Sequence, residues 1–194
     1  QLEVHPWSQE VNKFRSQMSD LAEQVDPALR NTGYAVIEDL PEASRNHQSQ
    51  THRALTYGVI HNPKELRQSQ CLVENRRAVI KLVSEFHPDV CAVEAVIYVQ
   101  SFQTAIVMGA ARASSLMAAA EADIPIHEYP PKRVKQAVVG RGSATKDQVA
   151  FMMRALFGLK ETPVSDAADA LAIGLAHFYT SPTKSLLDQA VRQL

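Results

Sequence analysis

An uninterrupted apolar run is the feature that most constrains the fold of this chain. Residues 90–98 are almost all β-branched, Ala or Cys, and the only charge among them is Glu94. Such a run predicts a strand buried on both faces, as in a parallel sheet. A helical pattern over residues 102–121 and a short apolar run at 124–129 follow it. This strand–helix–strand order predicts an α/β protein with parallel crossovers.

The segments on either side complete the expected architecture. Residues 33–38 and 54–60 have the composition of strands, which indicates antiparallel hairpins at one end of a mixed sheet. Helical spacing of apolar residues predicts helices at 7–25, from Pro63 to about Phe86, from about Pro131, and at 145–156, 166–177 and 182–194. We expect an N-terminal extension (1–20, possibly helical), one α/β domain (21–180) and a tail helix (181–194).

Charge is distributed unevenly along the chain. The 20 Lys and Arg residues against 21 Asp and Glu residues give a net charge of −1, which by itself argues against a nucleic-acid-binding protein. Residues 130–146, however, contain five basic residues and no acid, which leaves 15 basic against 21 acidic residues, or −6, elsewhere. This basic segment forms either a solvated helix face or a surface that contacts phosphates, which gives affinity rather than sequence selectivity.

Four acidic residues form a candidate metal site. Glu94 interrupts the apolar strand, where a carboxylate is costly unless paired or metal-bound; alternatively it lies at the strand end and reaches solvent. Asp166 and Asp169 share one face of a helix's first turn, where capping is the alternative role. Asp26 precedes Pro27, where an Asx turn is the simpler interpretation. Together they could hold two divalent ions about 3.5–4 Å apart, an arrangement suited to phosphodiester hydrolysis.

Other bulk features exclude several classes of protein. The two cysteines, Cys71 and Cys91, form no CxxC pair, which favours a reduced compartment and gives no indication of a zinc site. The first residues have neither the basic nor the apolar region of a signal peptide. The longest apolar stretch, residues 102–122, contains Arg112, which is expensive in lipid. We therefore expect a soluble protein without a membrane span.

Several motifs occur in a characteristic order along the chain. They are Asp26-Pro27 with residues 31–38, Ala92-Val93-Glu94, Gly109-Ala110-Ala111-Arg112, residues 133–140 (RVKQAVVG) and residues 166–173 (DAADALAI). In these motifs, from about residue 25 to residue 177, the chain resembles the RuvC-type Holliday junction resolvases. The resemblance implies the ribonuclease H-like fold, a three-layer α/β arrangement in which helices flank a mixed five-stranded sheet.

The resemblance also implies a set of site residues. The four metal-binding catalytic carboxylates would be Asp26, Glu94, Asp166 and Asp169, holding two Mg²⁺ ions for which Mn²⁺ can substitute. Lys135 and Lys146 would contact DNA near the scissile phosphate. The expected DNA-binding set also includes Arg133, Arg141 and Tyr98.

The implied partners follow from the same resemblance. Family members are homodimers that bind four-way junctions and nick two opposed strands symmetrically, and the two-fold symmetry of the enzyme suits that of the junction. Residues 109–115 would form part of the dimer interface. A branch-migration complex of the RuvA and RuvB type would be a partner, in the bacterial cytoplasm.

The chain departs from the family pattern in several places. Ala28 replaces a Gly, the segment Leu21-Ala22-Glu23-Gln24-Val25 is polar for a first strand, Ile97 replaces an aromatic residue, and Gln100 replaces a Lys. Two hypotheses follow. The first is a Mg²⁺-dependent endonuclease that resolves Holliday junctions in recombination and repair. The second is a non-catalytic module that binds branched DNA. His177, two helical turns after Asp169, is left outside the catalytic set.

Overall fold

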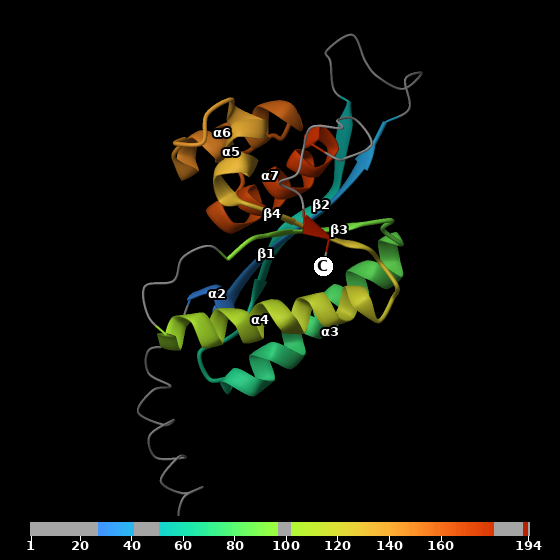
Figure 1. The fold of residues 1–194 in the computed structure, drawn as a ribbon, viewed down its shortest axis with the longest axis vertical. Helices are drawn as coiled ribbons and strands as arrows, with labels where there is room; N and C mark the ends of the chain where they lie inside the picture. Colours follow the sequence, from blue (N-terminus) through green and yellow to red (C-terminus); the bar gives the residue numbers. More distant parts are fainter. Residues whose placement is uncertain (1–26, 41–50, 97–101, 181–191, 194) are drawn as a thin grey trace, which may run out of the picture.

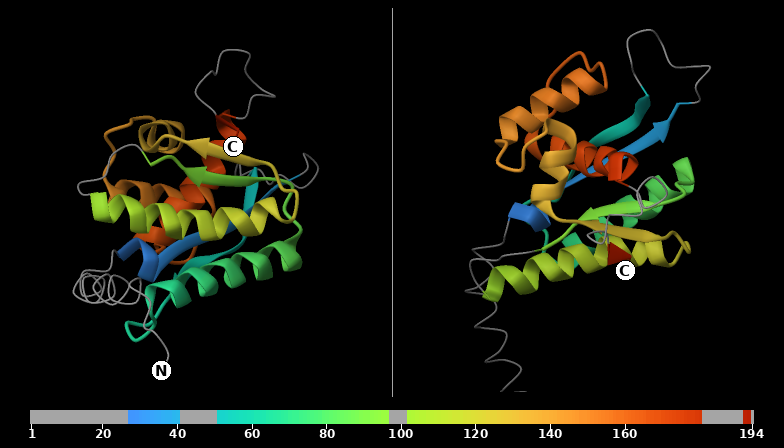
Figure 2. Two further views of the ribbon diagram at one scale, coloured as in Figure 1. Left: turned by 60° about the horizontal axis from the view of Figure 1, so that its bottom comes forward. Right: turned by 45° about the horizontal axis from the view of Figure 1, so that its top comes forward.

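The computed structural model describes residues 27–40, 51–96, 102–180 and 192–193. Its strands lie between two layers of helices (Figures 1 and 2). Helices α3 (Gln68–Phe86) and α4 (Phe102–Ala120) pack together on one side, while α5 (Pro131–Val139), α6 (Lys146–Leu156) and α7 (Ser165–Thr180) form the other layer. This three-layer α/β arrangement confirms the predicted fold class.

The first two described strands form the expected antiparallel hairpin. Strand β1 (Asn31–Asp39) follows the short helix α2 (Pro27–Arg30) directly and pairs with β2 (His52–His61). The register shifts between Val36 and Ile37, which marks a β-bulge. Both strands cover the segments that their β-branched and aromatic composition predicted.

The predicted strand–helix–strand unit is also confirmed. Strand β3 (Cys91–Glu94) runs parallel to β4 (Ile126–Tyr129), and α4 provides the crossover. Strand β3 is shorter than the predicted 90–98, because its pairing with β4 ends where the Ala95 N–H donates to the Tyr129 carbonyl at 2.9 Å. Residues 97–101 lie outside the described part of the chain.

Strand β5 (Arg192–Gln193) pairs antiparallel with β4. At these two residues the predicted tail helix is wrong, because the free edge of β4 offers backbone donors and acceptors that an extended segment satisfies. Residues 181–191, where the rest of that helix was predicted, lie outside the described residues.

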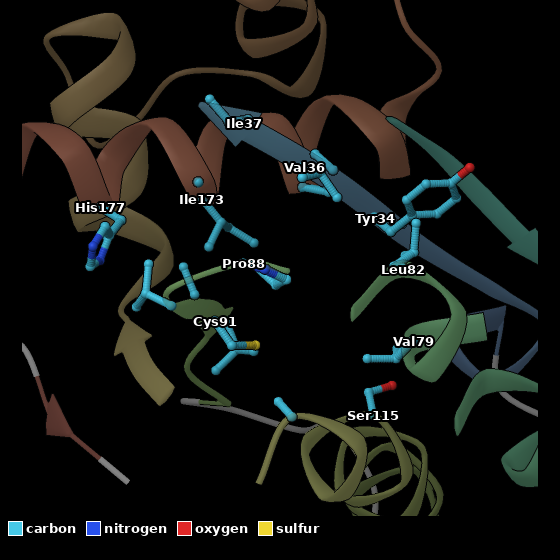
Figure 3. A pocket seen from close by; sticks show the side chains of 18 of the residues that line it. Tyr34, Val36, Ile37, Val79, Leu82, Pro88, Cys91, Ser115, Ile173 and His177 are labelled. Atoms are coloured by element: carbon cyan, nitrogen blue, oxygen red, sulfur yellow. The ribbon is translucent and has the colours of Figure 1, made fainter. Parts of the chain in front are cut away.

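The described strands form two sheets rather than one. Strands β1 and β2 make one sheet, and β3, β4 and β5 make the other, so a single five-stranded sheet is not confirmed. A cavity of about 360 Å³ lies between β1 and β3, and apolar side chains of α3 and α7, among them Leu82 and Ile173, project into it (Figure 3). The facing edges of β1 and β3 are therefore not hydrogen-bonded to each other.

Helix α3 begins at Gln68, not at Pro63 as predicted. The Arg30 guanidinium donates to the carbonyls of Pro63, Lys64 and Leu66, and these contacts hold residues 63–67 in a turn. Pro favours the first turn of a helix, but here long-range hydrogen bonds to Arg30 satisfy the carbonyls instead. None of the helices in the described segments is long and apolar enough to cross a membrane.

The main hydrophobic core lies between the α5–α7 layer and the strands. Its most buried members include Tyr129, Met153 and Leu171, each with 0% exposure. A smaller core of Leu29, Cys71 and Ala111 joins α2 to α3 and α4.

Two close approaches align α7 with β1. A Cβ added at Gly33 would lie 2.0 Å from the carbonyl oxygen of Asp166, and one added at Gly174 would lie 2.7 Å from Cδ1 of Ile37. Along α7, Asp166 and Gly174 are eight residues apart, and along β1, Gly33 and Ile37 are four residues apart. Both separations correspond to about 12–13 Å, so the helix and the strand run alongside each other with matching contact points. The pairing fixes the first turn of α7 at the beginning of β1.

Candidate metal and nucleic-acid site

Glu94 is the last residue of β3 and its side chain is solvent-accessible. It therefore lies at a strand end, as the simpler of the two sequence interpretations held, rather than in the middle of a buried strand. This position still leaves it within electrostatic range of Asp169, Lys146 and Lys135, which all influence the pKa of its carboxyl.

Asp166 lies in the first turn of α7, as predicted, whereas Asp169, predicted in the same turn, begins the next one three residues later. The backbone of Asp166 packs against Gly33, where any larger residue would collide with its carbonyl. Ala167 and Ala168 between the two acids are 1% exposed, so the helix start is anchored in the core. Asp169 keeps 38% of its side chain exposed and thus faces the surface from a rigid base.

Two lysines from separate helices lie near these acids. The Nζ atom of Lys146 is 3.6 Å from Oδ2 of Asp169. Lys146 occupies the first position of α6, whose start is fixed by a capping box between Thr145 and Gln148. Lys135, on α5, is partly buried and lowers the pKa values of both Glu94 and Asp169.

The surroundings of Glu94 and Asp169 disfavour the ionised form of both carboxyl groups. Although the Glu94 side chain reaches solvent, the protein around it partly desolvates the carboxyl and raises its pKa above the ordinary value. Asp169 raises this pKa further, against the opposing effects of Lys146, Lys135 and Arg112. Burial likewise raises the pKa of Asp169; Lys146 opposes that rise and Asp166 adds to it. Carboxylates that repel one another in this way are suited to binding a cation, which would relieve the repulsion.

The donor chemistry therefore fits a hard divalent ion, but the described residues do not complete the site. Within residues 27–40, 51–96, 102–180 and 192–193, no three His, Cys, Asp or Glu side chains are grouped so that they could hold a metal ion. The fourth predicted ligand, Asp26, lies outside the described residues. The four-carboxylate site stays a prediction.

The other predicted DNA-binding residues differ in accessibility. Arg141 and Lys146 are exposed, and Arg133 is partly buried on α5. Arg141 borders a shallow depression that Phe151 also lines. Tyr98 falls outside the described residues. The basic side chains of this set thus lie on α5, on α6 and on the loop between them, which is the helix layer that contains the two Asp residues.

The structure also adds residues that the sequence did not assign. Arg112 on α4 donates to the backbone carbonyl of Glu94 and pairs with Glu128. Its sequence signals were a charge within an apolar helix and its place in the motif Gly109-Ala110-Ala111-Arg112. His177 lies 2.7 Å, through Nδ1, from the hydroxyl of Tyr129, and burial lowers the pKa of its ring, with His127 lowering it further. These contacts are typical of a core histidine.

Comparison with known proteins supports a family assignment. Residues 24–177 match the family model described as crossover junction endodeoxyribonuclease RuvC. The chain is 54% identical to the crossover junction endodeoxyribonuclease RuvC of Akkermansia muciniphila over 158 residues, which cover 81% of this chain and 89% of that protein. It is 39% identical to the protein of the same name from Syntrophomonas wolfei, over 86% of this chain and 92% of the relative.

The solved structures agree with the sequence relatives. The fold matches Thermus thermophilus RuvC with a TM-score of 0.70 and 29% identity, covering 86% of this chain and 95% of that one. It also matches T. thermophilus RuvC in complex with a Holliday junction substrate, with a TM-score of 0.72. The matched residues include the crossover unit, the basic segment and the acidic helix start, and on this evidence the chain belongs to the RuvC family of crossover junction endodeoxyribonucleases.

Proposed function

We propose that this protein is a metal-dependent endonuclease that cleaves four-way DNA junctions. The observation that carries the proposal is the electrostatic interaction of Glu94, at a strand end, with Asp169, near a helix start, in the presence of Lys135 and Lys146. These two acidic and two basic side chains come from four different elements, β3, α7, α5 and α6. The relatives are named for this activity, and one relative's structure contains a Holliday junction substrate.

The proposed site would hold divalent metal through Glu94, Asp166 and Asp169, together with Asp26. We expect two Mg²⁺ ions, with Mn²⁺ as a substitute, because hard cations prefer carboxylate oxygens. When bound, such ions activate water and stabilise the leaving oxygen in phosphodiester hydrolysis.

The chain's own basic residues would hold the DNA strand. Lys146 lies at the N-terminus of α6, where the helix dipole adds to its positive charge in attracting a phosphate. Lys135, on α5, would neutralise the negative charge of the DNA backbone. Arg133, Arg141 and Tyr98 complete the proposed DNA-binding set, with the arginines contributing affinity rather than sequence selectivity.

We further propose that the protein acts as a homodimer through α4. The exposed positions of this helix follow one face at spacings of three and four residues and have no charge: Phe102, Ile106, Gly109, Ala113, Met117 and Ala120. Phe102 and Ile106 are 89% and 65% exposed, and nothing lies within 4 Å of where a Cβ of Gly109 would be. A second copy would cover this apolar face, and its small residues would let two helices approach closely.

The remaining partner follows from the family alone. We propose that the protein works with a branch-migration complex of the RuvA and RuvB type in the bacterial cytoplasm. The alternative of a non-catalytic junction-binding module is motivated by the departures of the sequence from the family pattern, among them Ala28 and Gln100.

Cleavage of a synthetic four-way junction tests the proposal. With Mg²⁺ the wild-type protein should nick two opposed strands, and Asp166→Asn should abolish cleavage yet bind the junction within about twofold of wild type, because removing one carboxylate leaves the basic surface intact. Lys160→Ala, a change outside the acidic site and the basic segment, is the control and should cleave normally. An intact junction across pH, salt and Mn²⁺ would reject the nuclease and favour the binding module.

A further inference from the structure

Arg112 on α4 contacts both strands of the parallel pair. Its Nη1 atom donates to the backbone carbonyl of Glu94, and its Nη2 atom lies 2.7 Å from Oε1 of Glu128 on β4. The side chains of Arg112 and Glu128 are only 20% and 17% exposed. The planar fork of an arginine can serve two such acceptors at once, which the single ammonium of a lysine does not reproduce.

The Glu94 carbonyl has a clear need for this donor. The N–H groups of Cys91 and Ala95 both donate toward β4, to Pro125 and Tyr129. Alternate residues of an extended strand direct their backbone groups to opposite edges, so the carbonyl of Glu94 points away from β4. Among the described residues that edge of β3 has no strand partner, and the guanidinium satisfies the carbonyl there.

The ion pair with Glu128 does not by itself explain why an arginine stands at this position. Arg112 is the one charged residue in the sequence of α4. A partly buried ion pair is weak evidence for stabilisation, because apolar residues of similar size often serve as well. The specific feature of the contact is its target, the peptide group that directly follows the Glu94 side chain.

We propose that Arg112 is a positioning residue for Glu94. By bonding the Glu94 carbonyl while anchored to Glu128, it holds the end of β3 in the conformation that brings the Glu94 carboxylate to Asp169. The inference rests on the proposed function, in which Glu94 is a metal ligand, and it identifies what keeps that ligand in place.

Mn²⁺ binding to the DNA-free protein, followed by electron paramagnetic resonance of the free ion, tests the inference. Arg112→Lys should weaken Mn²⁺ binding about ten- to a hundredfold, as is usual when the support of a metal ligand is removed. In a Glu94→Gln background the same substitution should change the affinity less than about twofold, because the ligand that Arg112 positions is already gone.

The matched control is Arg76→Lys. Arg76 pairs with Glu121, just beyond the end of α4, so this change replaces the arginine of an arginine–glutamate pair in the same helix layer without a contact to β3. It should leave Mn²⁺ affinity unchanged. If Arg112→Lys does not fold, Glu128→Gln removes the anchor instead and should also weaken Mn²⁺ binding in the wild-type background only.

The possible outcomes separate the two proposals. If the Arg112→Lys variant binds Mn²⁺ as tightly as wild type does, Arg112 does not position Glu94. The same holds if the substitution weakens Mn²⁺ binding equally in the wild-type and Glu94→Gln backgrounds. Either result would leave the proposed metal site intact. If wild type and Glu94→Gln bind Mn²⁺ equally, Glu94 is no ligand, and the proposed metal site fails together with the inference.

Discussion

At the scale of single residues, the environment of Asp169 makes a prediction about pH. Burial raises the pKa of its carboxyl above the ordinary value of 3.8. The cost of ionising it in the folded state is therefore absent below pH 3.8, grows as the pH rises, and is complete above the folded pKa. Asp169→Asn should raise the unfolding temperature of the metal-free protein at pH 7 by about 1–3 °C, with a gain that shrinks toward pH 4. Calorimetry at both pH values measures this.

Metal addition provides the control for this residue. Mg²⁺ should raise the unfolding temperature of wild type, because it binds the folded protein, and should raise that of Asp169→Asn less. A lower unfolding temperature for metal-free Asp169→Asn at pH 7 would contradict the prediction, since the ion pair with Lys146 would then outweigh the cost of burial.

The sequence could identify the acids but not what holds them. Glu94 and Asp169 stood out because carboxylates in apolar surroundings are conspicuous in any sequence. The role of Arg112 could not be predicted, because its acceptors, the Glu94 carbonyl and Glu128, come together only when β3 pairs with β4.

At the scale of elements, the fit of α7 against β1 depends on Gly33. An added methyl group would meet the backbone of Asp166 at 2.0 Å, and backbone at a buried helix start cannot easily move aside. Gly33→Ala should therefore lower the free energy of unfolding by about 1–3 kcal/mol. Because the displaced residue is Asp166, Mn²⁺ affinity should fall as well. Urea denaturation and Mn²⁺ titration measure the two effects.

Gly58→Ala is the control in the same hairpin. Its added methyl group would meet the far end of the Tyr34 side chain at 3.1 Å, which can rotate away. It should change the free energy of unfolding by less than about 1 kcal/mol and leave Mn²⁺ affinity unchanged. If both substitutions lower the free energy of unfolding equally, the effect of Gly33→Ala comes from replacing a strand glycine in general and not from the contact with α7.

The elements themselves were predictable where local patterns agreed with the tertiary structure. The β1–β2 hairpin and the β3–α4–β4 crossover follow from residue composition and spacing. The start of α3 does not, because Arg30, distant in sequence, takes the carbonyls that a helix beginning at Pro63 would need. The strand at Arg192–Gln193 depends in the same way on the free edge of β4.

At the scale of the whole molecule, a net charge of −1 conceals a separation of charge. The basic segment forms α5, the start of α6 and the loop between them, next to the acids of α7, so the neutral total says little about nucleic-acid binding. The separation of β1 and β3 into two sheets could not be read from strand patterns, since it depends on what occupies the space between their edges.

The uncharged face of α4 predicts how the whole molecule assembles. Ile106 is 65% exposed on that face, so Ile106→Glu would place a charge in the proposed dimer interface, where burying it unpaired is costly. We expect the variant to sediment as a monomer and to lose paired cleavage of the junction while still folding. Phe151→Glu is the matched control, because Phe151 is 62% exposed on α6, in the opposite helix layer, and this variant should remain a dimer. A dimeric Ile106→Glu protein would place the interface elsewhere, and a monomeric wild type would mean that each of the two nicks is made by an independent molecule.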